Sequence, residues 1–188
     1  MKKTLIVLGV IALLGFIVVS WFWGSYNSLV AGNQQVDQSW AQVESQYQRR
    51  FDLIPNLVNA TKGYMKQEQT VFKDIADART HYAGASSPND KVQASNQYES
   101  AIGRLLVVME NYPVLKSDAA VQRLTDELAG TENRINIARD RYNQQVSGWN
   151  TTIKSFPQNL LAGMFGFQPR EFYKSQQGAE NAPTVNLE

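Results

Sequence analysis

The feature that most constrains this chain is an uninterrupted apolar run near its N-terminus. Residues 4–23 read TLIVLGVIALLGFIVVSWFW and contain no charged side chain. A helix rises about 1.5 Å per residue, so a run of this length covers about 30 Å, the thickness of the hydrocarbon core of a bilayer. The run therefore predicts one membrane-spanning helix, with the lipid bilayer as the first partner of the chain.

Basic and aromatic residues predict the orientation of this helix. Lys and Arg near a span resist translocation, and Lys2 and Lys3 precede the run, whereas the next cation is Arg49. We expect residues 1–3 to form a cytoplasmic stub and the chain beyond residue 23 to lie outside the cytoplasm. Aromatic side chains favour the membrane interface. The expected interface residues are Lys2, Lys3, Trp21, Phe22, Trp23 and Tyr26.

A cleaved signal peptide is the alternative interpretation of the same run. Val18 and Ser20 stand at suitable positions before a cleavage site. The apolar run is longer than the core of a usual signal peptide, however, and bulky Trp21 and Trp23 crowd the site. We therefore favour an uncleaved signal-anchor. No cysteine is present, so an attached lipid on cysteine is excluded.

Composition narrows the range of functions. The formal charge of the chain is +1, and it becomes −1 without Lys2 and Lys3, which argues against a nucleic-acid-binding surface. The chain has no cysteine and one histidine, His81, so we expect no disulfide, no metal site and no cofactor.

Apolar spacing predicts helices throughout the exported part. A first stripe at mostly three- and four-residue spacing comprises Leu29, Val36, Trp40, Val43, Tyr47, Phe51 and Ile54. Pro55 should kink or restart this helix, and Asp52 could cap the restart. Two shorter helices should follow, the second with Pro88 near its start and a stop near Pro113.

The most regular stripe lies in the last predicted helix. It alternates spacings of three and four, as in a coiled coil, from Val121 to Phe156, after the N-cap candidates Ser117 and Asp118. No segment alternates like a strand. The predicted fold is all-α: a single transmembrane helix over residues 4–23, an antiparallel up-down four-helix bundle with long first and last helices over residues 24–167, and a flexible tail over residues 168–188.

The segment that follows this helix is strongly apolar but too short to span a bilayer. Residues 156–167 read FPQNLLAGMFGF, and an up-down bundle should return them to the membrane surface. They could cap the core of the bundle, contact lipid headgroups, or contact a neighbouring subunit.

Several separated motifs resemble the LemA family. They are YNSLV at residues 26–30 with Val36 and Trp40, VESQYQRRFDLIPNLV at 43–58, KGY at 62–64, NYP at 111–113, ELAGTENRINIARDRYN at 127–143 and FP at 156–157. The resemblance implies a single-pass bacterial membrane protein with an antiparallel helical bundle outside the cytoplasm. The resemblance implies no catalysed reaction. The family is associated with membrane proteases and with envelope maintenance, but these associations cannot be assigned to particular residues of this chain.

Enzymatic interpretations find little support in the sequence. A ferritin-like di-iron site needs Glu-x-x-His on two helices, and His81 has no Glu three residues before it. His81 stands in a polar stretch without a GxSxG motif, and we expect it to pair with Asp77 on the surface. The chain also lacks P-loop, GxGxxG and HExxH motifs, so we expect no enzyme.

Polar residues inside the motifs have two interpretations. Arg49 and Arg50 could pair with Glu127 or Glu132 across neighbouring helices and fix their register, or the polar residues could form an exposed protein-binding face. Gly130 indicates either the close approach of another helix or a local bend. The interaction candidates are Arg49, Arg50, Asp52, Asn56, Glu132, Asn133, Asn136, Phe156, Leu160, Leu161, Phe165 and Phe167.

The sequence leaves two functional hypotheses open. The first is a non-enzymatic, membrane-anchored scaffold that forms homo-oligomers in the bacterial inner membrane. The second is an adaptor or regulator that binds another envelope protein, such as a membrane protease. A transmembrane sensor is disfavoured, because only residues 1–3 should remain in the cytoplasm.

Overall fold

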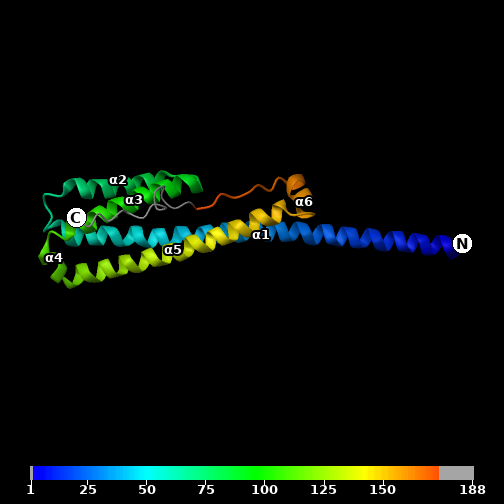
Figure 1. Cartoon of the computed structure of the whole chain (residues 1–188), viewed down its shortest axis with the longest axis horizontal. Coiled ribbons are helices and arrows are strands. Elements are labelled where there is room, and N and C mark those ends of the chain that lie inside the picture. Colours follow the sequence, from blue (N-terminus) through cyan, green and yellow to red (C-terminus); the bar gives the residue numbers. More distant parts are fainter. Residues whose placement is uncertain (1, 174–188) are drawn as a thin grey trace, which may run out of the picture. The chain divides into compact units, whose positions relative to one another are not determined.

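A computed structural model describes residues 2–173, and every regular element among them is a helix, as predicted (Figure 1). The long elements are α1 (Lys2–Lys62), α2 (Gln69–Gly84), α3 (Pro88–Met109) and α5 (Ala119–Lys154). Two short helices, α4 (Pro113–Ser117) and α6 (Gln158–Phe165), were not predicted. The first and last of the long helices are the longest, with 61 and 36 residues, which agrees with the prediction.

Helix starts follow the expected capping chemistry. The Asp118 carboxylate accepts hydrogen bonds from the amides of Ala120 and Val121, at 2.8 and 3.2 Å. Pro88 lies in the first turn of α3, and the Ser87 hydroxyl accepts from the Asp90 amide. These side chains satisfy amides that have no partner within the helix, so each fixes the residue at which its helix begins.

The predicted restart at Pro55 is wrong, because α1 continues through this residue to Lys62. Pro55 supplies no amide for the carbonyl four residues earlier, which usually weakens a helix. The neighbouring side chains of Ile54 and Leu57 are each only 1% exposed. Their packing holds the chain helical despite the missing hydrogen bond. Asp52 therefore lies inside α1, where it accepts from the amide of Gln48, and caps nothing.

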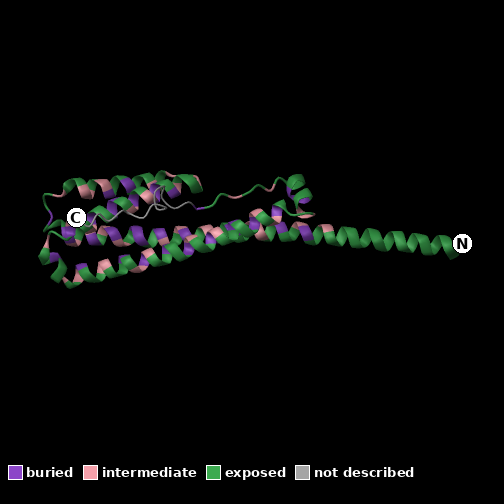
Figure 2. Cartoon of the chain, in the orientation of Figure 1, coloured by how far each residue is buried: buried purple, intermediate pink, exposed green. Residues whose placement is uncertain are grey.

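The N-terminal part of α1 has the length and composition of a membrane-spanning helix. None of the most apolar part of α1 is buried against other described residues. Residues 2–21 are all exposed. Figure 2 shows this end of α1 as continuously exposed, whereas buried residues alternate with exposed ones farther along the helix. Burial in a protein core therefore does not explain why this part of the helix is apolar.

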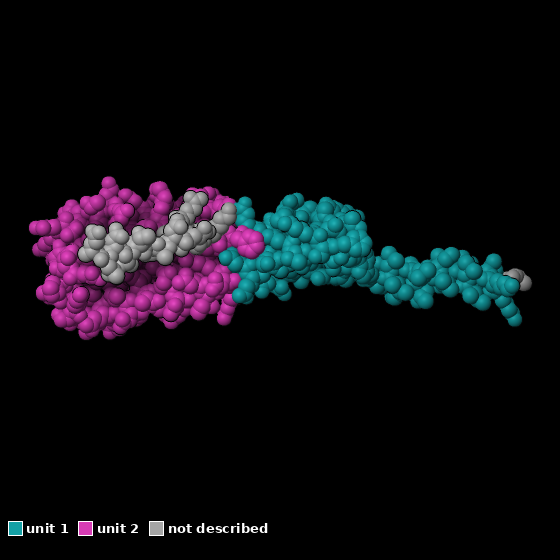
Figure 3. Space-filling view, viewed as in Figure 1, with its two compact units in different colours: residues 1–40, 142–171 teal, residues 41–141, 172–188 magenta. Residues whose placement is uncertain are grey.

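The described residues divide into two compact units (Figure 3), with residues 2–40 and 142–171 in unit 1 and residues 41–141 and 172–173 in unit 2. The core of unit 1 joins α1, α5 and α6. Its buried members include Leu29, Val36, Val146, Trp149, Ile153 and Leu161. A Cβ atom on Gly32 would lie 3.2 Å from the Trp149 ring, so α1 packs against this indole at a glycine.

The core of unit 2 joins α1, α2, α3, α4 and α5. Phe51 of α1 packs against Tyr82 of α2 and Tyr98 of α3, with ring centroids 4.5 and 4.6 Å apart. Other buried members are Ile54, Leu57, Ile102, Leu105, Leu115, Leu128 and Ile135. Of the two alternatives at Gly130, the close approach of another helix is wrong, because no atom of a neighbouring element lies within 4 Å of the position of its Cβ. The close contact at a glycine occurs at Gly32 instead.

Replacing the cap of α5 tests how much this start contributes. Asp118→Ala removes both hydrogen bonds to the first turn and should lower the free energy of unfolding by about 1 kcal/mol. Chemical denaturation followed by circular dichroism measures the change. Asp126→Ala, at an exposed position in the same helix, is the control and should change stability by less than about 0.5 kcal/mol. Equal effects of the two substitutions would contradict the capping role.

Candidate functional site

The densest polar cluster in the described chain is a network of charges inside unit 2. Arg50 of α1 lies 2.7 Å from a carboxylate oxygen of Glu132 on α5 and 3.6 Å from one of Glu99 on α3. Arg139 of α5 also pairs with Glu99. Glu99 therefore lies between two arginines from different helices. We call Arg50, Glu99, Glu132 and Arg139 the charge network.

Each of these residues borders an apolar stripe of its own helix. Arg50 stands three residues after buried Tyr47 and four before buried Ile54, so it shares their face of α1. Glu99 follows buried Tyr98, and Arg139 follows buried Ala138. Side chains at the edge of a stripe reach the space between helices, so packing of the apolar faces brings the charged groups together.

Tyrosine and serine hydroxyls complete the network. The Tyr47 hydroxyl donates to Glu99 at 3.0 Å and lies 2.8 Å from the Tyr173 hydroxyl. The Tyr173 hydroxyl is also 2.9 Å from that of Ser95. Arg139 donates to the Tyr47 hydroxyl and lies over the Tyr173 ring, 4.6 Å from its centroid. The extended segment after α6 therefore contributes one side chain, Tyr173, to the network.

Charge balance explains how these groups tolerate burial. Two arginines face two carboxylates, and the side chains of Arg50, Arg139 and Glu99 are only 7%, 15% and 18% exposed. Burial lowers the pKa of Arg139, but Tyr47, Tyr173 and Glu99 outweigh this and raise it overall, so the guanidinium stays charged. Burial, together with Tyr173 and Glu99, raises the pKa of the Tyr47 hydroxyl, which stays protonated.

The network is suited to fixing the register of helices. Ion pairs in a partly buried site are directional, and a helix that slides by one turn would leave an arginine or carboxylate without its partner. Arg50 pairs with Glu132, one of the partners that the sequence analysis named, and so links α1 to α5. Glu99 adds α3 to the same set, which the sequence analysis did not foresee.

In unit 1, a second polar cluster binds the segment that follows α6. The Trp149 indole donates to the Gln168 carbonyl at 3.0 Å, and the Tyr142 hydroxyl donates to the Glu171 carbonyl at 2.9 Å. Asn150 and the backbone of Arg170 exchange two hydrogen bonds of 2.8 Å. The sequence analysis assigned residues 168–173 to the tail, yet α5 binds much of their backbone. Residues 174–188 lie outside the described chain.

Helix α6 packs beside α1 within unit 1 (Figure 1). The Phe165 ring lies 4.7 Å from that of Tyr26 and 6.0 Å from that of Phe22. Phe167 contacts both Tyr26 and Trp149, with centroids 6.4 and 5.6 Å apart. The segment after α5 thus meets the helix at the end of the apolar run.

The structure divides the residues predicted to form sites into three groups. Arg50 and Glu132 join the charge network. In unit 1, Leu161 is buried, Phe165 packs against Phe22 and Tyr26, and Phe167 packs against Tyr26. Asn136 bridges the network from outside, donating to Glu132 at 3.3 Å and accepting from Arg139 at 3.2 Å. The remaining residues lie exposed: Lys2, Lys3, Trp21, Trp23, Arg49, Asp52, Asn56, Asn133, Phe156 and Leu160.

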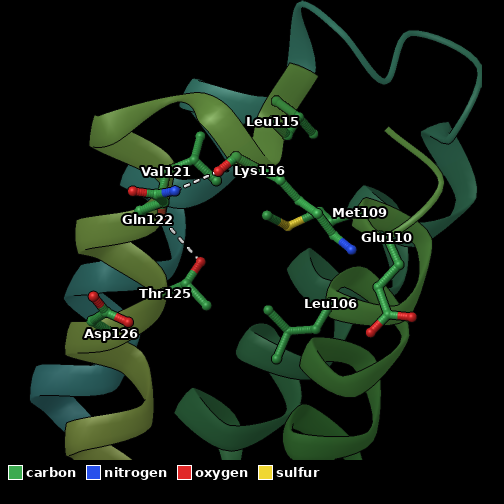
Figure 4. A pocket seen from close by; sticks show the side chains of 9 residues that line it. All are labelled: Leu106, Met109, Glu110, Leu115, Lys116, Val121, Gln122, Thr125 and Asp126. Atoms are coloured by element: carbon green, nitrogen blue, oxygen red, sulfur yellow. Dashed lines mark hydrogen bonds between the residues drawn. The ribbon is translucent and has the colours of Figure 1, made fainter. Parts of the chain in front are cut away.

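A pocket of about 470 Å³ opens in unit 2 where α3, α4 and α5 meet (Figure 4). Leu106, Met109, Leu115 and Val121 provide its apolar wall. The polar groups that Figure 4 shows joined are satisfied locally, since the Gln122 amide donates to the Lys116 carbonyl and the Thr125 hydroxyl to the Val121 carbonyl. Within residues 2–173, no group of three or more His, Asp or Glu side chains could hold a metal ion.

Sequence reasoning missed Ser95, Glu99, Arg139 and Tyr173 of the network, and Asn150 and Arg170 of the second cluster. One usable signal was present. Arg50, Glu99 and Arg139 each stand at the edge of an apolar stripe, and the charge of Glu99 is opposite to that of the two arginines. A search for opposite charges at the edges of apolar stripes would have predicted that these side chains are in contact. Tyr173 and Arg170 follow α6 in an extended segment, where no periodicity indicates a partner.

Removing the central carboxylate tests the charge network. Glu99→Gln keeps the shape of the side chain but leaves two buried arginines with one carboxylate, so it should lower the free energy of unfolding by about 3 kcal/mol. Glu127→Gln is the matched control, because Glu127 is exposed and makes no ion pair among the described residues. Chemical denaturation compares the two variants with the unaltered chain. Equal stability of both would contradict the structural role of Glu99.

Buried tyrosines predict how stability depends on alkaline pH. Burial is the largest cause that raises the pKa of Tyr47, Tyr82 and Tyr98, so the folded state holds these protons more tightly than the unfolded state. The resulting stability is fully present below the unfolded pKa of about 10 and falls above it, by up to about 1.4 kcal/mol per pH unit for each tyrosine.

The Tyr98 hydroxyl isolates this effect, because it is buried without a hydrogen-bond partner in the described chain. Denaturation of Tyr98→Phe above pH 10 should show a shallower loss of stability than the unaltered chain. Tyr64→Phe, at an exposed tyrosine, should leave the slope unchanged. A Tyr98→Phe slope equal to that of the unaltered chain would contradict the assignment.

Comparison with known proteins gives the family. The LemA family model matches residues 39–187. Magnetosome proteins MamQ 1 and MamQ 2 of Paramagnetospirillum magneticum are each 26% identical to this chain over 202 residues, covering 94% of it and 74% of the relative. Protein LemA of Metamycoplasma hominis is 21% identical over 140 residues, covering 74% of this chain and 64% of that protein. None of these names describes an enzymatic activity. The family match takes in well over half of the sequence, and the chain belongs to the LemA family.

Proposed function

We propose that this protein is a single-pass, membrane-anchored scaffold that self-associates in the bacterial inner membrane and acts by binding rather than by catalysis. The observation that carries the proposal is the continuity of α1. The same unbroken helix contains an apolar run with no buried part and, farther along, residues packed in both compact units. In this proposal residues 1–3 are cytoplasmic, the apolar run crosses the bilayer, and all later elements are extracytoplasmic.

The proposed scaffold is an antiparallel up-down bundle of α1, α2, α3 and α5. Short connections support it, because residues 63–68 join α1 to α2 and residues 85–87 join α2 to α3. Short loops favour antiparallel neighbours. The charge network supports it as well, since it links α1, α3 and α5 through complementary charges at one level of unit 2.

Features of the exposed surface support action by binding. Ile137 is half exposed on α5, next to exposed Asn136 and one turn from Asn133. Val114 of α4 is also well exposed. Confinement of anchored copies to one membrane raises their effective concentration, so weak contacts through such residues can suffice for assembly. The names of the magnetosome relatives refer to a cellular structure rather than to a reaction, which agrees with this view.

Native mass spectrometry of the full chain in mild detergent tests self-association. We expect assemblies of two or more copies at micromolar concentration, because the contacts proposed here are made between identical chains. Asn133→Arg with Ile137→Glu should reduce assembly, because these changes place charge on the exposed face of α5. Gln144→Arg, at another exposed position of α5, is the control. A clean monomer for the unaltered chain would contradict the scaffold proposal.

The second candidate is an adaptor for another envelope protein, which the exposed asparagines of α5 favour. Crosslinking in membranes separates the two functions. Recovery of one dominant partner protein, lost in the Asn133→Arg variant and retained in Gln144→Arg, would support the adaptor. Crosslinks between copies of the chain would support the scaffold.

A further inference from the structure

Helix α6 is unusual because both of its faces are apolar. Residues 155–169 contain no charged side chain, and Lys154 and Arg170 flank this uncharged stretch. Leu161 and Ala162 are buried against unit 1, with 3% of their surface exposed. A short helix needs only one apolar face to pack on its own core. The second face therefore needs a separate explanation.

The outward face of α6 presents large side chains to the surroundings. Phe156, Leu160 and Met164 follow one another at four-residue spacing and are 79%, 61% and 67% exposed. Side chains four residues apart lie on the same side of a helix, so Leu160 and Met164 share one face, and Phe156 immediately precedes the helix. We call these three residues the outer face of α6. Capping the core of unit 1 accounts for Leu161 and Phe167 but leaves the outer face uncovered.

Contacts within unit 1 fix the level of α6 along α1. Phe165 touches Phe22 and Tyr26, and Phe167 also touches Tyr26. Phe22 belongs to the apolar run, and Tyr26 lies three residues beyond its end at Trp23. At about 1.5 Å per residue, α6 therefore meets α1 within about 5 Å of the end of the run. This is the level at which a spanning helix passes through lipid headgroups.

Composition favours lipid over a protein partner as the occupant of the outer face. Protein interfaces surround their apolar centre with a polar and charged rim. The outer face has no charged residue near it within residues 155–169, and the exposed indoles of Trp21 and Trp23 lie close along the same stretch of α1. Phe and Leu on the apolar side of a short helix are typical of helices that lie in a membrane interface. Exposed Lys154 is a cation suited to a lipid phosphate.

We propose that the outer face of α6 inserts into the outer leaflet beside α1, with Phe156, Leu160 and Met164 at the boundary between phospholipid headgroups and acyl chains. This proposal rests on the membrane anchorage proposed above. It adds a second point of lipid contact, separated from the first by more than a hundred residues of sequence. Lys154, at the end of α5, lies toward the headgroup phosphates.

Site-directed spin labelling tests the insertion directly, because the chain has no natural cysteine. The full chain carrying Leu160→Cys or Met164→Cys is labelled with a nitroxide and reconstituted in vesicles of phosphatidylcholine and phosphatidylglycerol. Collision with oxygen, which concentrates in lipid, is compared with collision with a water-soluble nickel chelate. Leu13→Cys, in the apolar run, is the lipid control. Val107→Cys, a 65% exposed apolar residue in unit 2, is the solvent control.

The labels at residues 160 and 164 should show an oxygen-to-nickel ratio several-fold above that of residue 107 and below that of residue 13. Ratios equal to that of residue 107, with residue 13 in lipid, would overturn the insertion and leave the anchor intact. Shielding from both reagents, with disulfide formation between copies at Leu160→Cys, would assign the outer face to a second copy and also overturn it. Exposure of residue 13 to nickel would overturn the anchor and the insertion together.

Discussion

The structure depends on one constraint, that α1 must satisfy two environments along a single unbroken helix. Its side chains from residue 5 to residue 19 are apolar or small and exposed, with no described residue packed over them. Its later side chains, among them Val43, Tyr47 and Ile54, are almost fully buried by other helices. Exposing the first set to water would cost about 25 cal/mol for each Å² of apolar surface. The first part is therefore suited to a non-aqueous surrounding, whereas packing against other helices accounts for the second part.

The charge network contributes specificity more than stability. Burying two arginines and two carboxylates carries a desolvation cost that their attraction roughly repays, so a well-packed apolar core would hold the helices about as strongly. An apolar stripe of regular spacing, however, tolerates sliding by one turn. Glu99 lies between Arg50 and Arg139 and opposes such sliding, because each arginine finds a carboxylate at only one position along the helix axes. In this interpretation the network favours one alignment of α1, α3 and α5.

Local patterns explain most of what the sequence could predict. The start of α5 follows from Asp118, whose carboxylate accepts from amides two and three residues later. The ion pair of Arg50 and Glu132 could be predicted because both residues stand in long, regular helices. Pro55 was misjudged because its local preference loses to the burial of Ile54 and Leu57, which is a tertiary effect. The two alternatives at Gly130 stayed open for a similar reason, since sequence cannot tell an open glycine from one in contact, such as Gly32.

The segment after α6 lay beyond prediction for a different physical reason. The side chains of Trp149, Asn150 and Tyr142 donate hydrogen bonds to its backbone carbonyls. Every residue type has a backbone carbonyl, so the amino-acid types of the segment do not indicate these contacts. The same bonds hold the chain that follows α6 against α5, while ring contacts of Phe165 and Phe167 with Tyr26 hold α6 against α1. A span alone leaves a protein free to tilt against the bilayer plane. With its outer face in the leaflet, α6 would restrict the tilt of unit 1, because tilting that side away from the membrane would lift Phe156, Leu160 and Met164 out of lipid.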